Sequence, residues 1–375
     1  MSRTPDVLVV GAGIVGAACA YELANEQIKV AVVEATGIGT GATAAGMGHI
    51  VALDDSEAQF ALTRYSQKLW EELRQRSPAA MEYQETGTIW VAAGEDEMAE
   101  VQRKHEYYGA RGVASEVLDA QALREAEPNL SKSLVGGLRV PGDAVLYPPC
   151  AAAFLMQEAV ERGAQVYTGH AVTSIGGGTA RLADGTSFSA KVIVNAAGQH
   201  ATRLTPGIQM EPRKGHLVIT ERYSGTIRHQ LVELGYLKSA HSTRSDSVAF
   251  NVQPRKTGQL LIGSSRQYVS EDGKVDAGIV ARMLRRAFEY IPELSTLSAI
   301  RIWTGFRAAT PDNLPLIGPW SADPSIFLAT GHEGLGITTS LATARLIADH
   351  LLGRASEIPG DPYLPSRQHE AVSHA

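Results

Sequence analysis

Residues 6–34 read DVLVVGAGIVGAACAYELANEQIKVAVVE, and this stretch decides the fold. Val7–Val10 is a short apolar run that ends at a glycine, which predicts a buried strand. Apolar residues then recur at helical spacing from Ile14 to Asn25. Ile28–Val33 is a second apolar run, which predicts another buried strand. A strand, a turn, a helix and a strand in this order are typical of a dinucleotide-binding fold.

Three glycines stand at G-x-G-x-x-G spacing in the turn before the helix: Gly11, Gly13 and Gly16. The first permits a tight turn, the second lets a pyrophosphate approach the backbone, and the third lets the helix pack close to the strands. The helix N-terminus, with Ile14 and Val15, offers free N–H groups and a partial positive charge to the phosphates. Glu34 lies near the spacing of about 20 residues at which a carboxylate accepts the ribose hydroxyls, and it argues against a phosphorylated ribose.

The composition sets the class of protein. The chain has 375 residues, 44% hydrophobic and 20% charged, which predicts a substantial core. A net charge of -6 gives no bulk attraction to nucleic acid or to an anionic membrane. The chain enters its first strand almost at once and has no long apolar run, so we expect neither a signal peptide nor a membrane span.

Two cysteines, Cys19 and Cys150, are too few for an iron–sulfur cluster or a structural zinc site, so no metal is predicted. We expect a cytoplasmic protein.

The segment after Glu34 is unusually small and uncharged. Residues 35–51 read ATGIGTGATAAGMGHIV, and such residues suit a backbone that lies against a flat ring system. A dinucleotide fold ending in glutamate, followed by this run, resembles the FAD-dependent amine and amino-acid oxidoreductases (the DAO family). That family includes glycine oxidase, sarcosine oxidase, D-amino-acid dehydrogenase and the flavin subunits of D-hydroxyproline and opine dehydrogenases. The resemblance implies contacts with FAD from Ala35, Thr40, Gly41, Ala42, Thr43, Gly46 and Met47.

A second glycine-rich turn near the C-terminus favours FAD over NAD. Residues 326–340 read IFLATGHEGLGITTS, which predicts a strand, a turn and a helix that continues to about Leu352. The N–H groups at such a helix end stabilise the negative charge that develops on a flavin when it is reduced. Motif and resemblance together assign FAD contacts to Gly331, His332, Glu333, Gly334, Leu335, Gly336 and Ile337, and the resemblance adds Val172, Ala197, Gly198 and Gly305. An ordinary sheet edge and turn is the alternative at Val172, Ala197 and Gly198.

The middle of the chain predicts a second domain. Three segments alternate apolar and polar residues between turn signals: His216–Thr220, Ser247–Val252 and Leu260–Ser264. We therefore predict an α/β protein with a Rossmann-type FAD-binding domain and an inserted, mainly antiparallel β-sheet substrate domain, similar to glycine oxidase. The predicted FAD-binding domain comprises residues 1–82, 140–210 and 311–362, and the substrate-binding domain comprises residues 83–139 and 211–310. Residues 138–149 are predicted to be a proline-rich loop, and residues 363–375 a flexible tail.

The resemblance implies oxidation of a C–N bond, in which hydride passes from the substrate to flavin N5 and the resulting imine hydrolyses. Arg307 lies in GFRAATPDNLPLIG, which resembles the family segment whose arginine holds the substrate carboxylate, although Ala308 replaces a common proline. A guanidinium binds a carboxylate bidentately. The candidate catalytic residues are Arg307, His49, Tyr236 and His332, and further pocket candidates are His241, Phe250 and Trp303; a structural role is the alternative for each. No general base is assigned.

The short motifs GMGHI and GHEGLGITTS are most similar to motifs in the flavin subunits of hydroxyproline and opine dehydrogenases. We therefore expect non-covalent FAD and a D-hydroxyproline or D-proline type of dehydrogenase, with electron-accepting partner subunits or a homo-oligomer. One alternative is an oxygen-using glycine, sarcosine or D-amino-acid oxidase. A second is a non-catalytic flavin subunit that transfers electrons within a complex. A third, an aromatic hydroxylase, would need a groove for NAD(P)H, and the sequence contains no signal for one.

Overall fold

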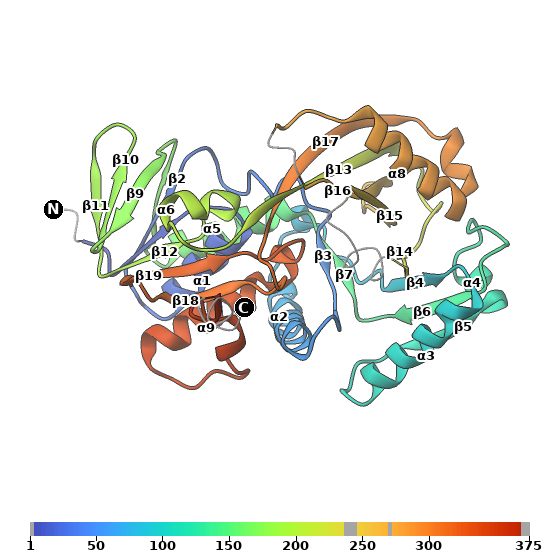
Figure 1. Ribbon diagram of the computed structural model, residues 1–375, viewed down its shortest axis with the longest axis horizontal. Helices are drawn as coiled ribbons and strands as arrows, with labels where there is room; N and C mark the ends of the chain where they lie inside the picture. The colour runs from blue at the N-terminus through green and yellow to red at the C-terminus, as the bar shows by residue number, and fades with distance from the viewer. Residues whose placement is uncertain (1–3, 236–245, 269–271, 369–375) are drawn as a thin grey trace. The chain divides into compact units, whose positions relative to one another are not determined.

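The computed structural model describes residues 4–235, 246–268 and 272–368 of the chain. The chain forms two compact units (Figure 1). The first unit lies within residues 1–81, 147–212 and 306–375, and the second comprises residues within 82–146 and 213–305. The functional domain limits predicted from the sequence stay a prediction. Among the described residues, no helix is both long enough and apolar enough to cross a membrane.

A six-stranded sheet forms the centre of the first unit, with the strand order β18-β19-β12-β1-β2-β8. β1 lies between β2 and β12 and is parallel to both, with Val9 opposite Val32 and Val194. All four residues of β1 are buried, as expected for a parallel strand covered on both faces. β18 is antiparallel to β19 and closes one edge. The strands are β1 (Val7–Val10), β2 (Val30–Glu34), β8 (Gln165–Thr168), β12 (Val192–Asn195), β18 (Leu316–Trp320) and β19 (Asp323–Thr330).

Helices α1, α5 and α9 pack side by side in the first unit, and α2 packs on α9. α1 is almost entirely buried, because the alanine-rich stretch that it contains lets its neighbours approach closely. Ser56 caps α2, since its hydroxyl accepts the N–H of Gln59 at 3.1 Å. The helices are α1 (Ile14–Asn25), α2 (Glu57–Arg74), α5 (Pro148–Glu161), α6 (Ala201–Leu204) and α9 (Gly336–Leu352), with 3₁₀ turns at Ala79–Met81, Gly198–His200 and Asp361–Tyr363.

A small antiparallel sheet, β11-β10-β9, covers part of the same core (Figure 1). Its strands are β9 (Val172–Gly176), β10 (Thr179–Leu182) and β11 (Ser187–Ser189). Asp184 and Gly185 lie in the hairpin turn that connects the antiparallel strands β10 and β11. The short strand β3 (His49–Ile50) also belongs to the first unit.

An eight-stranded sheet dominates the second unit, with the strand order β17-β13-β16-β15-β14-β4-β6-β5. β4 and β14 are parallel, whereas the pairs β13–β16, β15–β16, β14–β15, β4–β6 and β5–β6 are antiparallel. The predicted mainly antiparallel sheet, and with it the fold class, is confirmed. The strands are β4 (Thr88–Ala92), β5 (Glu116–Asp119), β6 (Gly136–Val140), β13 (Glu211–Arg222), β14 (Gln230–Glu233), β15 (Ser247–Pro254), β16 (Gln259–Arg266) and β17 (Ala299–Ala309), with β7 (Ala144–Val145) nearby in the chain.

Helix α8 (Ala277–Tyr290) packs on β15 and β16 and buries one face of this sheet. Ile279, Met283 and Ala287 recur at a spacing of four residues along its buried stripe. Asp276 caps the helix, because its carboxylate accepts the N–H groups of residues 278 and 279. α3 (Glu95–Gly109), α4 (Ala120–Ala126) and the 3₁₀ turn Pro292–Thr296 complete the second unit.

Two local predictions are wrong. Residues 138–149 were expected to be a loop, but they contain the end of β6, strand β7 and the start of α5. Pro148 and Pro149 stand at the first two positions of α5, where the missing N–H of proline has no cost. The predicted flexible tail is also partly ordered: residues 363–368 are held by side-chain hydrogen bonds, described below.

Candidate FAD-binding site

The turn between β1 and α1 is built around glycines that have no room for a side chain. A Cβ atom on Gly16 would stand 2.0 Å from the carbonyl oxygen of Gly11. Gly11 itself adopts a φ of +104°, and a Cβ atom on it would stand 2.6 Å from the carbonyl oxygen of Ala196. Any larger residue at either position would push the helix away from the strands, so the turn keeps the start of α1 close to the edge of the sheet.

The N-terminus of α1 offers backbone donors without competing acids. Gly13 is the N-cap and has no side chain with which to cap the helix, and the first turn has no acidic residue. The N–H of Ile14 donates to the hydroxyl oxygen of Thr43 at 2.9 Å. The helix end therefore carries the partial positive charge that suits an anion such as a diphosphate.

Glu34 lies at the end of β2 beside this turn. Its Oε2 accepts the N–H of Ala12 at 2.7 Å, and its Oε1 accepts the N–H and the hydroxyl of Thr36 at 2.8 and 2.9 Å. A carboxylate has about four acceptor positions, so three bonds orient it and leave capacity for a ribose hydroxyl. The exposed neighbour Ala35 adds no side-chain polar group.

The small-residue loop, residues 35–51, contacts both glycine-rich turns. Gly39 N–H donates to the carbonyl of Ala12 at 2.8 Å, which ties the loop to the first turn. At the other end, a Cβ atom on Gly46 would stand 2.7 Å from Cδ1 of Ile337 in α9. Thr43 and Met47 are buried, whereas Thr40, Gly41 and Ala42 are exposed. The predicted loop residues thus run from the first turn of α1 to the first turn of α9.

The turn before α9 places a second helix N-terminus next to the first. Gly331 and Glu333 have φ values of +80° and +51°. The N–H of Glu333 donates to the carbonyl of Ala308 at 2.8 Å. Leu335 precedes α9 without a side-chain cap, and its first turn has no acid. A Cβ atom on Gly336 would stand 3.7 Å from Val15 in α1, so the two uncapped helix ends are neighbours.

Arg307 lies beside the turn before α9. It is half-buried on β17, within the part of the strand that belongs to the first unit. Its Nε atom is 3.4 Å from the position that a Cβ atom on Gly334 would occupy. The Arg307 guanidinium therefore lies beside the turn that precedes α9, where the N–H groups of the helix end are located. Gly305 lies two residues earlier on the same strand, in the second unit.

His332 is buried and faces its own helix. Its Nε2 lies 3.0 Å from the hydroxyl of Thr343 in α9, and burial lowers its pKa to about 3, so the ring is neutral near pH 7. The sequence left two roles open, a bond toward the flavin or a part in holding the helix. This contact favours the second role.

The other candidates are spread over both units. His49 is half-buried on β3, and its carbonyl accepts the hydroxyl of Thr338 in α9 at 2.7 Å. Trp303 is half-buried on β17 in the second unit. Phe250 is a core residue stacked on Tyr290 with ring centroids 4.3 Å apart, so its prediction as a pocket residue is wrong. Tyr236 and His241 lie outside the described residues.

The remaining predicted contacts lie along β9 and β12. Val172 packs against the core beneath the small sheet. Ala197 and Gly198 follow β12, and the carbonyl of Gly198 accepts the hydroxyl of Thr330 at 3.0 Å. Asn195 is fully buried and donates to the carbonyl of Ala201. Thr330 and Asn195, which bond to this turn, could not be predicted, because a threonine or asparagine at a strand end has no distinctive local pattern.

A polar sheet face in the second unit was also missed. Thr88 and Gln230 are opposite each other on β4 and β14, and both are buried. Thr88 Oγ1, Gln230 Oε1 and the buried Asn251 Oδ1 on β15 have no hydrogen-bond partner among the described residues. Asn251 stands between two core residues, Phe250 and Val252. That alternation, visible in the sequence, was the available signal for a polar face opposite the core.

The comparisons identify the family. The FAD dependent oxidoreductase family (DAO) matches residues 6–350, almost the entire chain. The chain therefore belongs to this family and is a flavoprotein oxidoreductase whose cofactor is FAD. The site fits that cofactor: two adjacent helix ends with free donors, a fixed carboxylate, and glycines whose added Cβ atoms would crowd the backbone or the loop between them.

The most informative relatives align along nearly their full length. The chain is 29% identical to glycine oxidase of Geobacillus kaustophilus, which covers 93% of both chains. The crystal structure of that enzyme matches with a TM-score of 0.86 over 98% of this chain and 99% of the other. Hydrogen cyanide synthase subunit HcnC of Pseudomonas aeruginosa is 28% identical over 98% of this chain and 97% of the relative. L-proline dehydrogenase from P. horikoshii shares the fold, with a TM-score of 0.89 at 23% identity over 99% of both chains.

Proposed function

We propose that this protein oxidises the C–N bond of a small amino acid, with Arg307 as the anchor for the substrate carboxylate. The observation that carries the proposal is the position of Arg307, half-buried beside Gly334 at the start of α9. A guanidinium beside the ring site of a flavin protein fixes both the distance and the plane of a carboxylate. Glycine oxidase, the relative at 29% identity, acts on a substrate of this class by its name.

Bound FAD supplies the two-electron acceptor for such an oxidation. The chain supplies orientation. The dinucleotide part would be held by α1, Glu34 and the loop 40–47. The N–H groups at the N-terminus of α9 would stabilise the negative charge that a flavin gains on reduction. We propose that FAD is held without a covalent bond, since Cys19 is fully buried within α1 and Cys150 lies in the first turn of α5. Neutral, buried His332 holds the turn rather than transferring a proton.

Two substrate classes remain in the proposal. Cyclic secondary amino acids, D-hydroxyproline and D-proline, come first, because the GMGHI and GHEGLGITTS motifs resemble those dehydrogenases. Glycine and sarcosine come second, on the similarity to glycine oxidase. The HcnC relative is named as a subunit, which supports a protein electron acceptor as an alternative to oxygen.

The test mixes the FAD-loaded protein anaerobically with D- and L-proline, the hydroxyprolines, glycine and sarcosine and follows the visible absorbance of the flavin. We expect one of these amino acids to bleach the flavin. Slow reoxidation of the flavin in air then indicates a dehydrogenase. Fast reoxidation that produces hydrogen peroxide indicates an oxidase. Bleaching by none of them would refute the amino-acid proposal.

Substitutions then test the anchor. Arg307→Met should lower kcat/KM for the bleaching amino acid by at least about 100-fold, mostly through KM, and Arg307→Lys should lower it less. Arg181→Lys, at an exposed position on β10, is the matched control and should change neither constant. Turnover that survives Arg307→Met unchanged would remove the anchor and favour a flavin subunit that only transfers electrons.

A further inference from the structure

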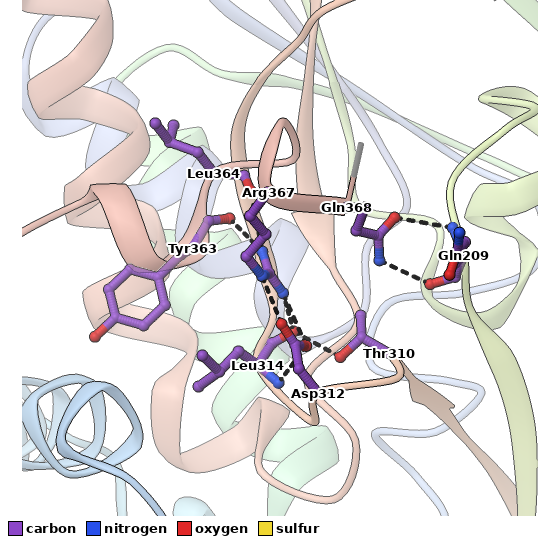
Figure 2. Close-up of polar contacts among 8 residues, drawn as sticks. All are labelled: Gln209, Thr310, Asp312, Leu314, Tyr363, Leu364, Arg367 and Gln368. Atoms are coloured by element: carbon purple, nitrogen blue, oxygen red, sulfur yellow. Dashed lines mark hydrogen bonds and ion pairs between the residues drawn. The ribbon is translucent and has the colours of Figure 1, made fainter. Parts of the chain in front are cut away.

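Arg367 uses all five of its guanidinium N–H groups in one cluster near the C-terminus (Figure 2). Nε and Nη2 donate to the carboxylate of Asp312 at 2.7 and 3.1 Å, and Nη2 also donates to the carbonyl of Leu314 at 2.6 Å. Nη1 donates to the carbonyls of Tyr363 and Leu364 at 3.0 and 3.1 Å. Its side chain is 16% exposed. A saturated guanidinium of this kind fixes two chain segments in one geometry.

The segment that Arg367 holds is the turn 310–314, between β17 and β18. Within this turn, the hydroxyl of Thr310 donates to the carbonyl of Leu314 at 2.7 Å, and the N–H of Leu314 donates to Asp312 at 3.1 Å. Asn313 has a positive φ of 59°. Burial acts to raise the pKa of Asp312, but the ion pair with Arg367 outweighs it and the pKa is lowered. Arg367 therefore stabilises the ionised form of the Asp312 carboxylate.

The turn 310–314 lies against the turn that precedes α9. A Cβ atom on Gly331 would stand 2.7 Å from Cγ2 of Thr310, which is fully buried. Ala309 forms a β-bridge with His332. A displacement of the turn 310–314 would therefore be transmitted to Arg307 through β17 and to the N-terminus of α9 through Gly331.

Two further contacts anchor the C-terminal segment itself. The hydroxyl of Tyr363 donates to the carbonyl of Ala58 in α2 at 2.7 Å. The amide of Gln368 bonds to both the N–H and the carbonyl of Gln209, each at 2.9 Å (Figure 2). The segment 361–368 is thus attached to the rest of the first unit on both sides of Arg367.

We propose that residues 361–368 form a C-terminal clamp in which Arg367 is a positioning residue for the FAD site. By holding the turn 310–314, Arg367 fixes the turn before α9 and, with it, Arg307. The part that concerns Arg307 rests on the proposed function, whereas the part that concerns FAD does not. Among the residues that the structure describes, Arg367 bonds to Asp312, Leu314, Tyr363 and Leu364, none of which is a predicted anchor or cofactor residue, so it acts through the turn.

The first experiment compares two truncations and measures the affinity for FAD by the fluorescence of released flavin. A chain that ends after Gln368 keeps the clamp and should bind FAD as the full chain does. A chain that ends after Leu364 lacks Arg367 and should bind FAD about tenfold more weakly, a change of about 1.4 kcal/mol. It should also shift the midpoint potential of the flavin. Equal affinity and equal potential in the two truncations would overturn the clamp.

Point variants separate positioning from general stability. Arg367→Gln should weaken FAD binding and raise KM for the bleaching amino acid, whereas Arg367→Lys should recover part of both, because it keeps the charge near Asp312 but loses the carbonyl contacts. The double variant Asp312→Asn with Arg367→Gln should weaken FAD binding little more than either single substitution does. A variant that only lowers the melting temperature would refute positioning. If no amino acid bleaches the flavin, the FAD affinity and potential still decide on the clamp.

Discussion

The hydroxyl oxygen of Thr43 accepts a hydrogen bond of 2.9 Å from the backbone N–H of Ile14. The bond joins the small-residue loop to the first turn of α1, and both partners are buried. Thr43→Val keeps the shape of the side chain but removes the acceptor. We expect the apoprotein to lose about 1–3 kcal/mol of unfolding free energy in urea titrations. Thr43→Ser keeps the hydroxyl and should lose much less; equal losses in both variants would contradict this role of the bond.

Gly16 should be intolerant of even one methyl group. A Cβ atom there would stand 2.0 Å from a backbone oxygen, which cannot move aside without displacing the turn. We expect Gly16→Ala to lower the unfolding free energy by at least about 2 kcal/mol and to weaken FAD binding.

Gly109 provides the matched control for that substitution. It is the last residue of α3, and an added Cβ atom would meet nothing within 4 Å. Gly109→Ala should be neutral or stabilising by up to about 1 kcal/mol and should leave FAD affinity unchanged. Normal FAD binding by Gly16→Ala would show that the turn can relax.

His332 should make the stability of the apoprotein depend on pH. Burial lowers its pKa in the folded state to about 3, below its usual value of about 6.5. Between these values the unfolded state binds more protons, so stability rises with pH, is complete above about pH 6.5, and is lost as the pH falls toward 3. The slope contributed by one such group is at most about 1.4 kcal/mol per pH unit.

Urea titrations at about pH 4, 5, 6 and 7 measure that contribution. The unfolding free energy of His332→Asn should rise less steeply with pH across this range than that of the parent chain, whatever the absolute stability of the variant. His170→Asn, at a half-buried position where the side chain is 42% exposed, is the control. Parallel curves for the parent and His332→Asn would mean that the ring is already accessible to protons in the folded state.

The two cysteines should react very differently with an alkylating reagent. Cys19 is fully buried, and burial raises the pKa of its thiol to about 12, so about one molecule in ten thousand carries the thiolate at pH 8. Cys150 is partly exposed. Mass spectrometry should find a single alkylated cysteine, Cys150, in the native protein and both in urea. Labelling of native Cys19 at a similar rate would indicate that α1 opens readily.

Local pattern was enough to predict many elements of the fold. α1 runs from Ile14 to Asn25, as the helical spacing of its apolar residues predicted. The second strand begins at Val30 rather than at Ile28, because Gln27 turns the chain with a φ of +59°. β14 was missed because Glu233, a charged residue in a buried strand, depends on an ion pair with Arg286 from a distant helix.

The candidate site was predictable where one segment carries the chemistry and not where distant segments meet. The glycines of the first turn and of the turn before α9 are recognisable from spacing alone. The contact between Gly46 and Ile337, and the bond between His332 and Thr343, depend on tertiary packing. Arg367 carried no signal, since its partners Asp312 and Leu314 are identified only when the chain has folded.

The order of the strands in the first sheet has a consequence for biosynthesis. β12 pairs with β1 on one side and with β19 on the other, yet β19 begins only at Asp323. While the ribosome is still producing the second unit, the nascent chain therefore presents β12 as an open edge with unpaired backbone groups. Such an edge can pair with other chains. We therefore expect the newly synthesised chain to need a chaperone until its last fifty or so residues have left the ribosome.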